Sequence, residues 1–275
     1  FTISTTLGLR KPLHVMERPT QLLTARKQNI ANHFSRCIPT YEVGGVTQRS
    51  IAEELVEMLE PIECGTILEI GCGTGLLSGL LRARLPHCHL VCNDLSPDME
   101  TPLREKVGDN ALFLPGDAEI IEWPGECDVV ASASCIQWWE DPLAFFPKAY
   151  EALADGGQLI FSTFLPGNLQ ELTAVTGAGL RYPSRCEIER AMEETGFVEI
   201  RLIEQRRTLH FPTLIRLLSH LRDTGTNSLS SGGLWTPRRL VELEHSYRNN
   251  LHLSPEAPLP LTYVGLRGSG WRKRK

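Results

Sequence analysis

The sequence predicts an α/β fold with a mostly parallel sheet that helices cover on both faces. Short apolar segments alternate with segments of helical periodicity through the middle of the chain, and this alternation indicates parallel strands joined by crossover helices. The expected strands are 66–70, 90–93, 111–114, 128–133 and 158–163. A glycine-rich segment, 71–75, directly follows the first strand and precedes a helix, which is where ligands bind in open parallel sheets.

The expected helices fit between these strands. Residues 47–60 repeat apolar side chains at helical spacing, with Thr47 as the expected N-cap and Pro61 as the stop. An apolar stripe over 76–85 predicts the helix after the glycine-rich segment. Asp141, which stands before a proline, is a typical start for the helix that leads to the fifth strand.

The last part of the chain predicts a helix at 185–195, a strand at 197–207 and a final strand at 259–266. Residues 208–254 between these two strands include two further expected helices and a Gly/Ser/Asn-rich link at 225–233. A compact sheet does not need so long a connection, so we expect a helical lid over the active site. The expected division is an N-terminal arm (1–28), a single domain (29–266) and a solvated basic tail (267–275).

The composition indicates a cytoplasmic protein that binds neither nucleic acid nor a membrane. The net charge is −5 over 275 residues, whereas nucleic-acid binding favours a basic surface. No run approaches the roughly 20 apolar residues of a membrane-spanning helix, and residues 1–8 do not suggest a signal peptide. The eight cysteines form no C-x-x-C pair and no histidine cluster accompanies them, so we expect reduced cysteines and no metal site.

The spacing of the glycines excludes two kinds of nucleotide site. A dinucleotide fingerprint, G-x-G-x-x-G, would place its third glycine at position 76, where Leu76 stands. No Gly-Lys-Ser/Thr triplet is present, which excludes the loop that binds nucleoside triphosphates. Gly71, Gly73 and Gly75 form the pattern G-x-G-x-G instead.

With Glu69 two residues ahead of the glycines, this segment resembles motif I of class I S-adenosylmethionine-dependent methyltransferases. The resemblance implies a Rossmann-like fold with a seven-stranded sheet, and S-adenosylmethionine as the cofactor. Glu69 would help to hold the amino group of this cofactor. Gly71, Gly73 and Gly75 would make room for its methionine part, and Cys72 between them is a further cofactor-binding candidate.

Two further strand ends carry residues that match this family. Asp94 closes the second strand, 23 residues after Gly71, and would accept hydrogen bonds from both ribose hydroxyls. Asp117 follows the third strand and would accept from the adenine amino group, with Ala118 donating from its backbone. The remaining cofactor candidates are Leu95, Glu119 and Ser134.

Several other segments resemble a narrower family, the malonyl-[acyl-carrier protein] O-methyltransferases of biotin synthesis. These segments are 30–36 with Tyr41, 136–141, 161–172, 211–213, 221–227 and 260–263. The resemblance implies methyl transfer to the free carboxylate of a malonyl thioester on acyl-carrier protein or coenzyme A. The product would be the methyl ester that starts pimeloyl and biotin synthesis. A carboxylate is ionised near neutral pH, so this chemistry needs no general base.

The candidates for the acceptor side are Arg36, Tyr41, Gln137, Trp138 and Tyr263. Gln137 and Trp138 follow the fourth strand, so they either line the site or pack between helix and sheet. For Tyr263 we favour core packing. A bound carboxylate favours an arginine fork, and further candidates for this role are Arg181, Arg185 and Arg222.

The arginines around the late strand and the lid are either a docking surface for an acidic carrier protein or an ordinary solvated face. They are Arg201, Arg206, Arg207, Arg216 and Arg222. We expect a monomer. Two other functions stay open: methyl transfer to another small molecule, such as a quinone precursor, and cofactor binding without catalysis.

Overall fold

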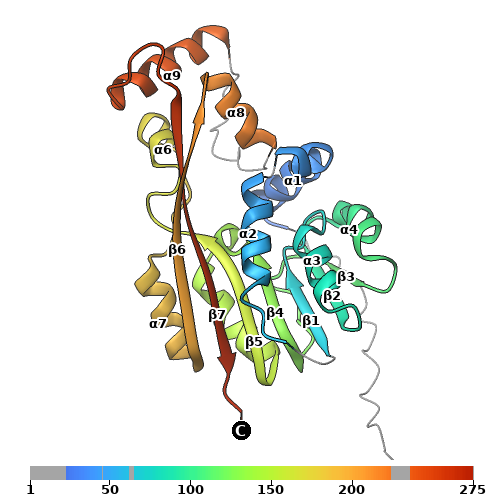
Figure 1. Cartoon of the computed structure of the whole chain (residues 1–275). Helices are drawn as coiled ribbons and strands as arrows, with labels where there is room; N and C mark the ends of the chain where they lie inside the picture. Colours follow the sequence, from blue (N-terminus) through green and yellow to red (C-terminus); the bar gives the residue numbers. More distant parts are fainter. Residues whose placement is uncertain (1–22, 45, 62–64, 224–235, 275) are drawn as a thin grey trace, which may run out of the picture.

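The computed structural model describes residues 23–44, 46–61, 65–223 and 236–274, and its centre is a seven-stranded sheet (Figure 1). The strand order is β3-β2-β1-β4-β5-β7-β6. Strands β1 to β5 are parallel, whereas β7 runs antiparallel to both of its neighbours, β5 and β6. The expected mostly parallel, Rossmann-like sheet is therefore confirmed. The strands are β1 Thr66–Ile70, β2 His89–Asp94, β3 Leu112–Pro115, β4 Cys127–Ala133, β5 Leu153–Phe164, β6 Phe197–Phe211 and β7 Leu259–Arg272.

Helices cover both faces of this sheet. Alternate residues of a strand point to opposite faces, and β1 shows the result: Ile67 joins the core under α2, α3 and α4, whereas Leu68 joins the core under α5 and α7. None of the helices in the described ranges is long and apolar enough to cross a membrane. The helices are α1 Ala25–Gly44, α2 Val46–Val56, α3 Leu76–Arg84, α4 Glu100–Val107, α5 Phe145–Ala152, α6 Gln170–Thr176, α7 Arg185–Thr195, α8 Leu214–Asp223 and α9 Pro237–Asn250.

The basic C-terminal residues belong to the sheet, so the expectation of a solvated tail over 267–275 is wrong. β7 continues to Arg272 and pairs with both neighbouring strands over this stretch. The alternating apolar pattern of a strand is not visible in this part of the sequence, because glycines stand where apolar residues would be expected. A Cβ on Gly268 would lie 2.5 Å from the ring of Phe161, so the neighbouring strand supplies the side chain that fills this space.

The N-terminal arm expected over 1–28 extends too far. α1 begins at Ala25, and Lys27 in its first turn is buried; residues 1–22 lie outside the described part of the chain. The helix buries Ile30 and Cys37 at helical spacing. Polar residues between them weaken the apolar stripe, which explains why the sequence does not reveal where this helix begins.

Other element boundaries differ from expectation by a few residues. Thr47 lies inside α2, which begins at Val46, rather than at its N-cap. Asp141 does act as a cap, because its Oδ1 accepts a hydrogen bond from the Leu143 N–H at 3.0 Å. This cap starts a short 3₁₀ turn, Pro142–Ala144, ahead of α5.

The connection between β6 and β7 contains the two expected helices, α8 and α9, at the far end of these long strands (Figure 1). α8 packs against α1, β6 and β7, while α9 packs mainly against α6. The Leu214 N–H donates to Glu244 Oε2 at 3.3 Å and so joins the two helices. A separate apolar core, which includes Leu217 and Tyr247, holds them on the strands. The link expected at 225–233 lies outside the described residues.

Candidate functional site

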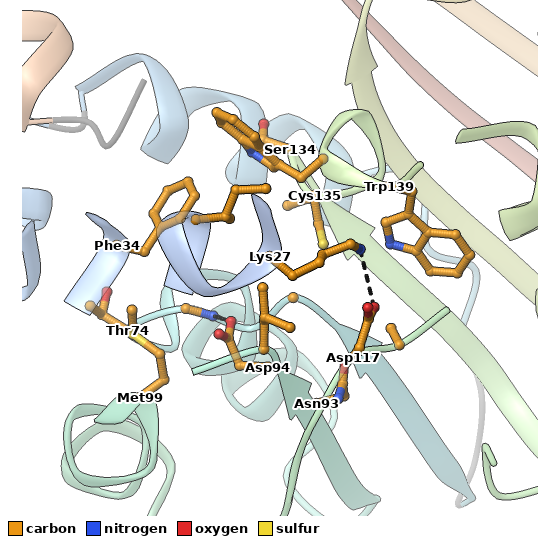
Figure 2. Close-up of a pocket in the computed structure, with 17 residues that line it drawn as sticks. Lys27, Phe34, Thr74, Asn93, Asp94, Met99, Asp117, Ser134, Cys135 and Trp139 are labelled. Atoms are coloured by element: carbon orange, nitrogen blue, oxygen red, sulfur yellow. Dashed lines mark hydrogen bonds and ion pairs between the residues drawn. The ribbon is translucent and has the colours of Figure 1, made fainter. Parts of the chain in front are cut away.

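A pocket lies between the carboxyl ends of the parallel strands and α1 (Figure 2). Its empty space is about 750 Å³, a volume that includes open solvent at the mouth. Parallel strands bring the segments that follow them to one edge of the sheet. Eight residues that the sequence assigned to the site line this pocket: Gly71, Gly73, Asp94, Leu95, Asp117, Ala118, Ser134 and Trp138.

The glycine-rich segment turns sharply at the end of β1. Gly71 and Gly73 have φ angles of 72° and 52°, a left-handed conformation that favours glycine. The N–H groups of Gly71 and Cys72 both donate to the carbonyl of Asn93 on β2, at 2.9 Å. A Cβ on Gly71 would lie 2.2 Å from Cys135 Sγ. The turn therefore packs so closely against the loop after β4 that only glycine fits at position 71.

Asp94 joins this turn to the end of β2. Its carboxylate accepts hydrogen bonds from the Gly73 N–H at 2.8 Å and from the Ser96 N–H at 2.9 Å. Burial raises the pKa of Asp94 to about 6, although these backbone donors oppose the shift. The pocket thus contains a carboxylate that is charged at neutral pH and loses its charge in mildly acidic solution.

The segment after β3 brings a second carboxylate to the pocket. Asp117 is buried, and its Oδ1 accepts a hydrogen bond from the Glu119 N–H at 3.1 Å. Lys148 on α5 fixes the segment, because its Nζ donates to the Ala118 carbonyl at 2.6 Å. Glu119 does not line the pocket. Its Oε1 accepts from the Glu140 N–H at 2.7 Å and links the segment to the loop after β4.

Glu69 lies outside the pocket lining. Its position in β1 places its side chain on the α3 face of the sheet, where Ser78 Oγ donates to its Oε2 at 2.5 Å. Burial raises the pKa of Glu69 to about 8, although the bond from Ser78 opposes the shift, so the carboxyl is largely protonated at neutral pH. Cys72 and Gly75 also lie outside the lining; Gly75 is the residue from which α3 begins.

Comparison with known proteins identifies the family. A family model described as a methyltransferase domain matches residues 68–161. A malonyl-[acyl-carrier protein] O-methyltransferase of Bacteroides thetaiotaomicron is 37% identical over 77% of this chain and 82% of that protein. Another, from Haemophilus ducreyi, is 32% identical over 90% of this chain and 97% of that protein. The chain belongs to the malonyl-[acyl-carrier protein] O-methyltransferase family.

Solved structures agree on the fold. A putative methyltransferase from Bacillus halodurans has a TM-score of 0.61 at 17% identity and covers 82% of this chain and 99% of its own. A phosphoethanolamine N-methyltransferase from Haemonchus contortus has a TM-score of 0.58 at 17% identity, over 92% of this chain and 61% of its own. The chain therefore shares its fold with these methyltransferases.

Two acceptor-side candidates of this methyltransferase lie beside one another after β4, but only one of them lines the pocket. Trp138 does, and it meets Phe34 of α1 edge to face, with ring centroids 5.4 Å apart. Gln137 is buried behind the lining, where its Nε2 donates to the Ser134 carbonyl at 2.6 Å. Gln137 therefore shapes the loop, whereas Trp138 supplies an apolar wall.

The other acceptor-side candidates lie away from the pocket. Tyr263 is buried in the core under α8 and α9, and its hydroxyl lies 2.9 Å from His220 Nε2. This confirms core packing with a satisfied hydroxyl. Arg36 is exposed on α1, and the side chain of Tyr41 lies outside the described part of the structure. The four arginines considered for the acceptor carboxylate are all exposed, and none lines the pocket: Arg36, Arg181, Arg185 and Arg222.

Nine pocket residues are not among the individual cofactor and acceptor candidates that the sequence predicts, although one of them, Thr74, lies within the predicted segment 71–75. They are Lys27, Ile30, Phe34, Thr74, Asn93, Met99, Ala133, Cys135 and Trp139. The first three form one face of α1, at a spacing of three and four residues. This helical spacing can be detected in the sequence, but its first residue, Lys27, lies within residues 1–28, which were expected to form an arm. The element that covers the pocket is thus α1, because no described residue of the β6–β7 connection lines it.

The pocket fits S-adenosylmethionine, the cofactor that the motif resemblance implies. Asp94 and Asp117 offer acceptors for hydroxyl and amino groups. Thr74 Oγ1 is buried without a hydrogen-bond partner among the described residues. A Cβ on Gly73 would meet nothing within 4 Å, so the turn faces open space. In the described ranges, no three His, Cys, Asp or Glu side chains form a group suited to a metal ion.

Proposed function

We propose that this enzyme transfers a methyl group from S-adenosylmethionine to the free carboxylate of a malonyl thioester. The observation that carries the proposal is the convergence of Gly71, Gly73, Asp94 and Asp117 on one pocket. Relatives that match 77% and 90% of the chain and are named for this reaction support the choice of acceptor. The methyl ester would then enter pimeloyl and biotin synthesis.

The strand-end residues would hold the cofactor along the edge of the sheet. The turn at Gly71 and Gly73 would make room for the methionine part, with Leu95, Ala118 and Ser134 completing the wall of the pocket. Asp94 would accept from the ribose hydroxyls, and Asp117 from the adenine amino group. When bound, the cofactor supplies a methyl group made electrophilic by the attached sulfonium.

The acceptor carboxylate needs alignment and exclusion of water rather than a base. Its oxygen forms the bond to the methyl carbon while the methyl–sulfur bond breaks and the electron pair remains on sulfur. Both reacting groups lose their charge, so a dry site favours the transition state. Ile30, Phe34 and Trp138 give the pocket an apolar wall beside α1. This wall would keep water from the reacting atoms.

The acceptor is proposed to arrive on an acyl-carrier protein or on coenzyme A. Of the five arginines expected at a docking surface, Arg207 is engaged by Glu54 on α2. The other four are exposed and remain the proposed docking surface for an acidic carrier: Arg201, Arg206, Arg216 and Arg222. We also propose that the α8–α9 insertion restricts access to the acceptor side, and that the enzyme is a cytoplasmic monomer without nucleic-acid or membrane partners.

A transfer assay with matched thioesters tests this proposal. The purified chain is incubated with S-adenosylmethionine labelled in its methyl group and with malonyl-carrier protein, malonyl-coenzyme A or acetyl-carrier protein. Label is expected in both malonyl thioesters as an alkali-labile ester and in neither the acetyl thioester nor an Asp94→Ala control. Absence of label from both malonyl thioesters, under conditions where the cofactor binds, would falsify the proposed acceptor.

A further inference from the structure

The first turn of α1 places a buried ammonium group among the carboxylates of the pocket. The Lys27 side chain is only 5% exposed. Its Nζ lies 3.1 Å from Asp117 Oδ1 and is also bonded to Glu119 Oε2. Figure 2 shows Lys27 reaching from α1 across the pocket toward Asp117. An unpaired charge is costly at this depth, so the pairing fixes both the lysine and its partners.

These contacts engage one oxygen of Asp117 in particular. Oδ1 receives both the Lys27 ammonium and the Glu119 N–H at 3.1 Å. No described residue donates to Oδ2, while Asp117 as a whole lines the pocket. The backbone beside it is held as well, because Trp123 Nε1 donates to the Ala118 carbonyl at 3.0 Å. Two donors on Oδ1 and a fixed backbone set the rotation of this carboxylate.

We propose that Lys27 is a positioning residue for nucleobase recognition. It holds Asp117 through Oδ1, so that Oδ2 is presented to the exocyclic amino group of the adenine. The inference rests on the proposed function for the identity of the cofactor. The inference also gives α1 a second role. This helix covers the pocket, and through Lys27 it makes the site select a base that carries an exocyclic amino group.

Charge balance explains why a lysine performs this role. Without the Lys27 ammonium, no described cation would bond to the Asp117 and Glu119 carboxylates, since the nearby Lys148 donates to the Ala118 and Ile121 carbonyls instead. Repulsion between the two carboxylates would favour rotation of Asp117 away from its position. A carboxylate free to rotate would discriminate poorly between a donor and an acceptor on the base. Lys27 thus affects selectivity for the base rather than affinity alone.

A pair of ligands that differ at the exocyclic group of the base tests this role. S-adenosylhomocysteine carries the amino group, whereas S-inosylhomocysteine carries in its place a carbonyl oxygen, which a carboxylate repels, together with a proton on the adjacent ring nitrogen. Calorimetric affinities for both are measured with the wild-type chain, Lys27→Met, Lys27→Arg and Asp117→Asn. Arg26→Met is the matched control, because Arg26 is also in the first turn of α1 and pairs with Glu140 at 2.7 Å, with its side chain 41% exposed.

The wild-type chain is expected to prefer the adenosyl ligand by at least about tenfold, since a charged acceptor gains a hydrogen bond. Lys27→Met and Asp117→Asn should each reduce this preference to about twofold or less. Lys27→Arg should retain most of it, and Arg26→Met should leave it unchanged. The double variant Lys27→Met/Asp117→Asn should lose no more selectivity than either single variant, because both act on the same carboxylate.

Several outcomes would overturn the inference. Equal weakening of both ligands in Lys27→Met would show that the lysine only tethers α1. Equal strengthening would show that Lys27 competes with the ligand. An unchanged preference for the adenosyl ligand in Lys27→Met would show that the lysine takes no part in recognition of the base. If the wild-type chain binds neither ligand, the proposed function fails, whereas a selective wild type with unchanged selectivity in Lys27→Met refutes this inference alone.

Discussion

The half of the sheet formed by β1 to β4 and the half formed by β5 to β7 carry function in different ways. In the first half, short segments after parallel strands supply the pocket, and they are tied together by hydrogen bonds such as that from the Gly73 N–H to the Asp94 carboxylate. In the second half, long antiparallel strands support α8 and α9 away from the pocket. The pocket is therefore built locally on strand ends, whereas the positions of α8 and α9 depend on packing between distant segments.

The largest expected effect comes from the close approach of Gly71 to the loop after β4. Gly71→Ala places a Cβ 2.2 Å from Cys135 Sγ, at a residue with φ of 72°. We expect binding of S-adenosylhomocysteine to fall by more than about 100-fold, because the turn and the loop after β4 must separate. Calorimetry measures the affinity.

Gly108→Ala is the matched control for this substitution. Its φ is 77°, but a Cβ there would meet nothing within 4 Å. It should therefore cost about 1–3 kcal/mol of unfolding free energy, because φ of 77° with ψ of 176° is a conformation that only glycine adopts readily, with cofactor affinity unchanged. Similar losses of affinity in the two variants would show that strain, rather than the close approach at the pocket, controls binding.

The next largest effect is expected at the carboxyl ends of the parallel strands, and a substitution at their amino ends provides the comparison. Asp94→Asn, at the carboxyl ends, should weaken binding of S-adenosylhomocysteine by roughly 10- to 100-fold, since charged acceptors are lost. Asp128→Asn is the control at the amino ends, where Asp128 Oδ2 accepts from the Thr66 N–H at 2.7 Å. This control should lower the melting temperature and leave affinity intact. A comparable loss of affinity at both ends would contradict the placement of the site.

The pKa of Asp94 makes cofactor binding sensitive to pH. Because the folded-state pKa is raised from 3.8 to about 6, the carboxylate is ionised at pH 7.5 and gains a proton as the pH falls through 6. Affinity for S-adenosylhomocysteine should decline by up to about tenfold per pH unit below 6, measured by calorimetry from pH 7.5 to 5. Asp94→Asn should flatten this decline. A wild-type profile that is flat over the whole range would contradict the assignment.

The same shift affects stability with the opposite sign. Between pH 3.8 and about 6 the folded state holds a proton on Asp94 that the unfolded chain has lost. This group therefore lowers the free energy of unfolding as the pH rises through that window. Cofactor binding and unliganded stability should consequently respond to acid in opposite directions at this residue.

The smallest effect is expected in the second half of the sheet. Tyr263→Phe removes the hydroxyl that lies 2.9 Å from His220 Nε2. The free energy of unfolding should fall by about 1 kcal/mol, with kcat and cofactor affinity nearly unchanged, as measured by denaturant titration and steady-state kinetics. A loss of kcat greater than about tenfold with normal stability would instead make Tyr263 a catalytic residue.

The contrast between the halves also explains what the sequence could predict. The turn at 71–75, Asp94 and Asp117 are visible because each follows an apolar strand and the spacing carries the chemistry. Lys27 and Phe34 were missed, because only the folding of α1 over the strand ends brings them to the pocket. Burial of Glu69 on the α3 face follows from the pleat of β1, which a motif does not reveal.

In the second half of the sheet, the sequence predicts the helices themselves but not where they pack. The positions of α8 and α9 within the connection were predictable from helical spacing and caps. Their placement on α1 and α6 was not, because contacts between distant segments leave no local pattern. The C-terminal end of β7 was missed because Gly268 replaces an apolar residue and gives its space to Phe161.

A crystal structure of the chain with S-adenosylhomocysteine bound tests the central claim most directly. We expect the ribose hydroxyls within hydrogen-bond distance of Asp94, the adenine amino group at Asp117 Oδ2 and the homocysteine along Gly71 and Gly73. We also expect Lys27 to remain bonded to Asp117. A nucleoside bound elsewhere, or one whose ribose does not contact Asp94, would contradict the assignment of this pocket.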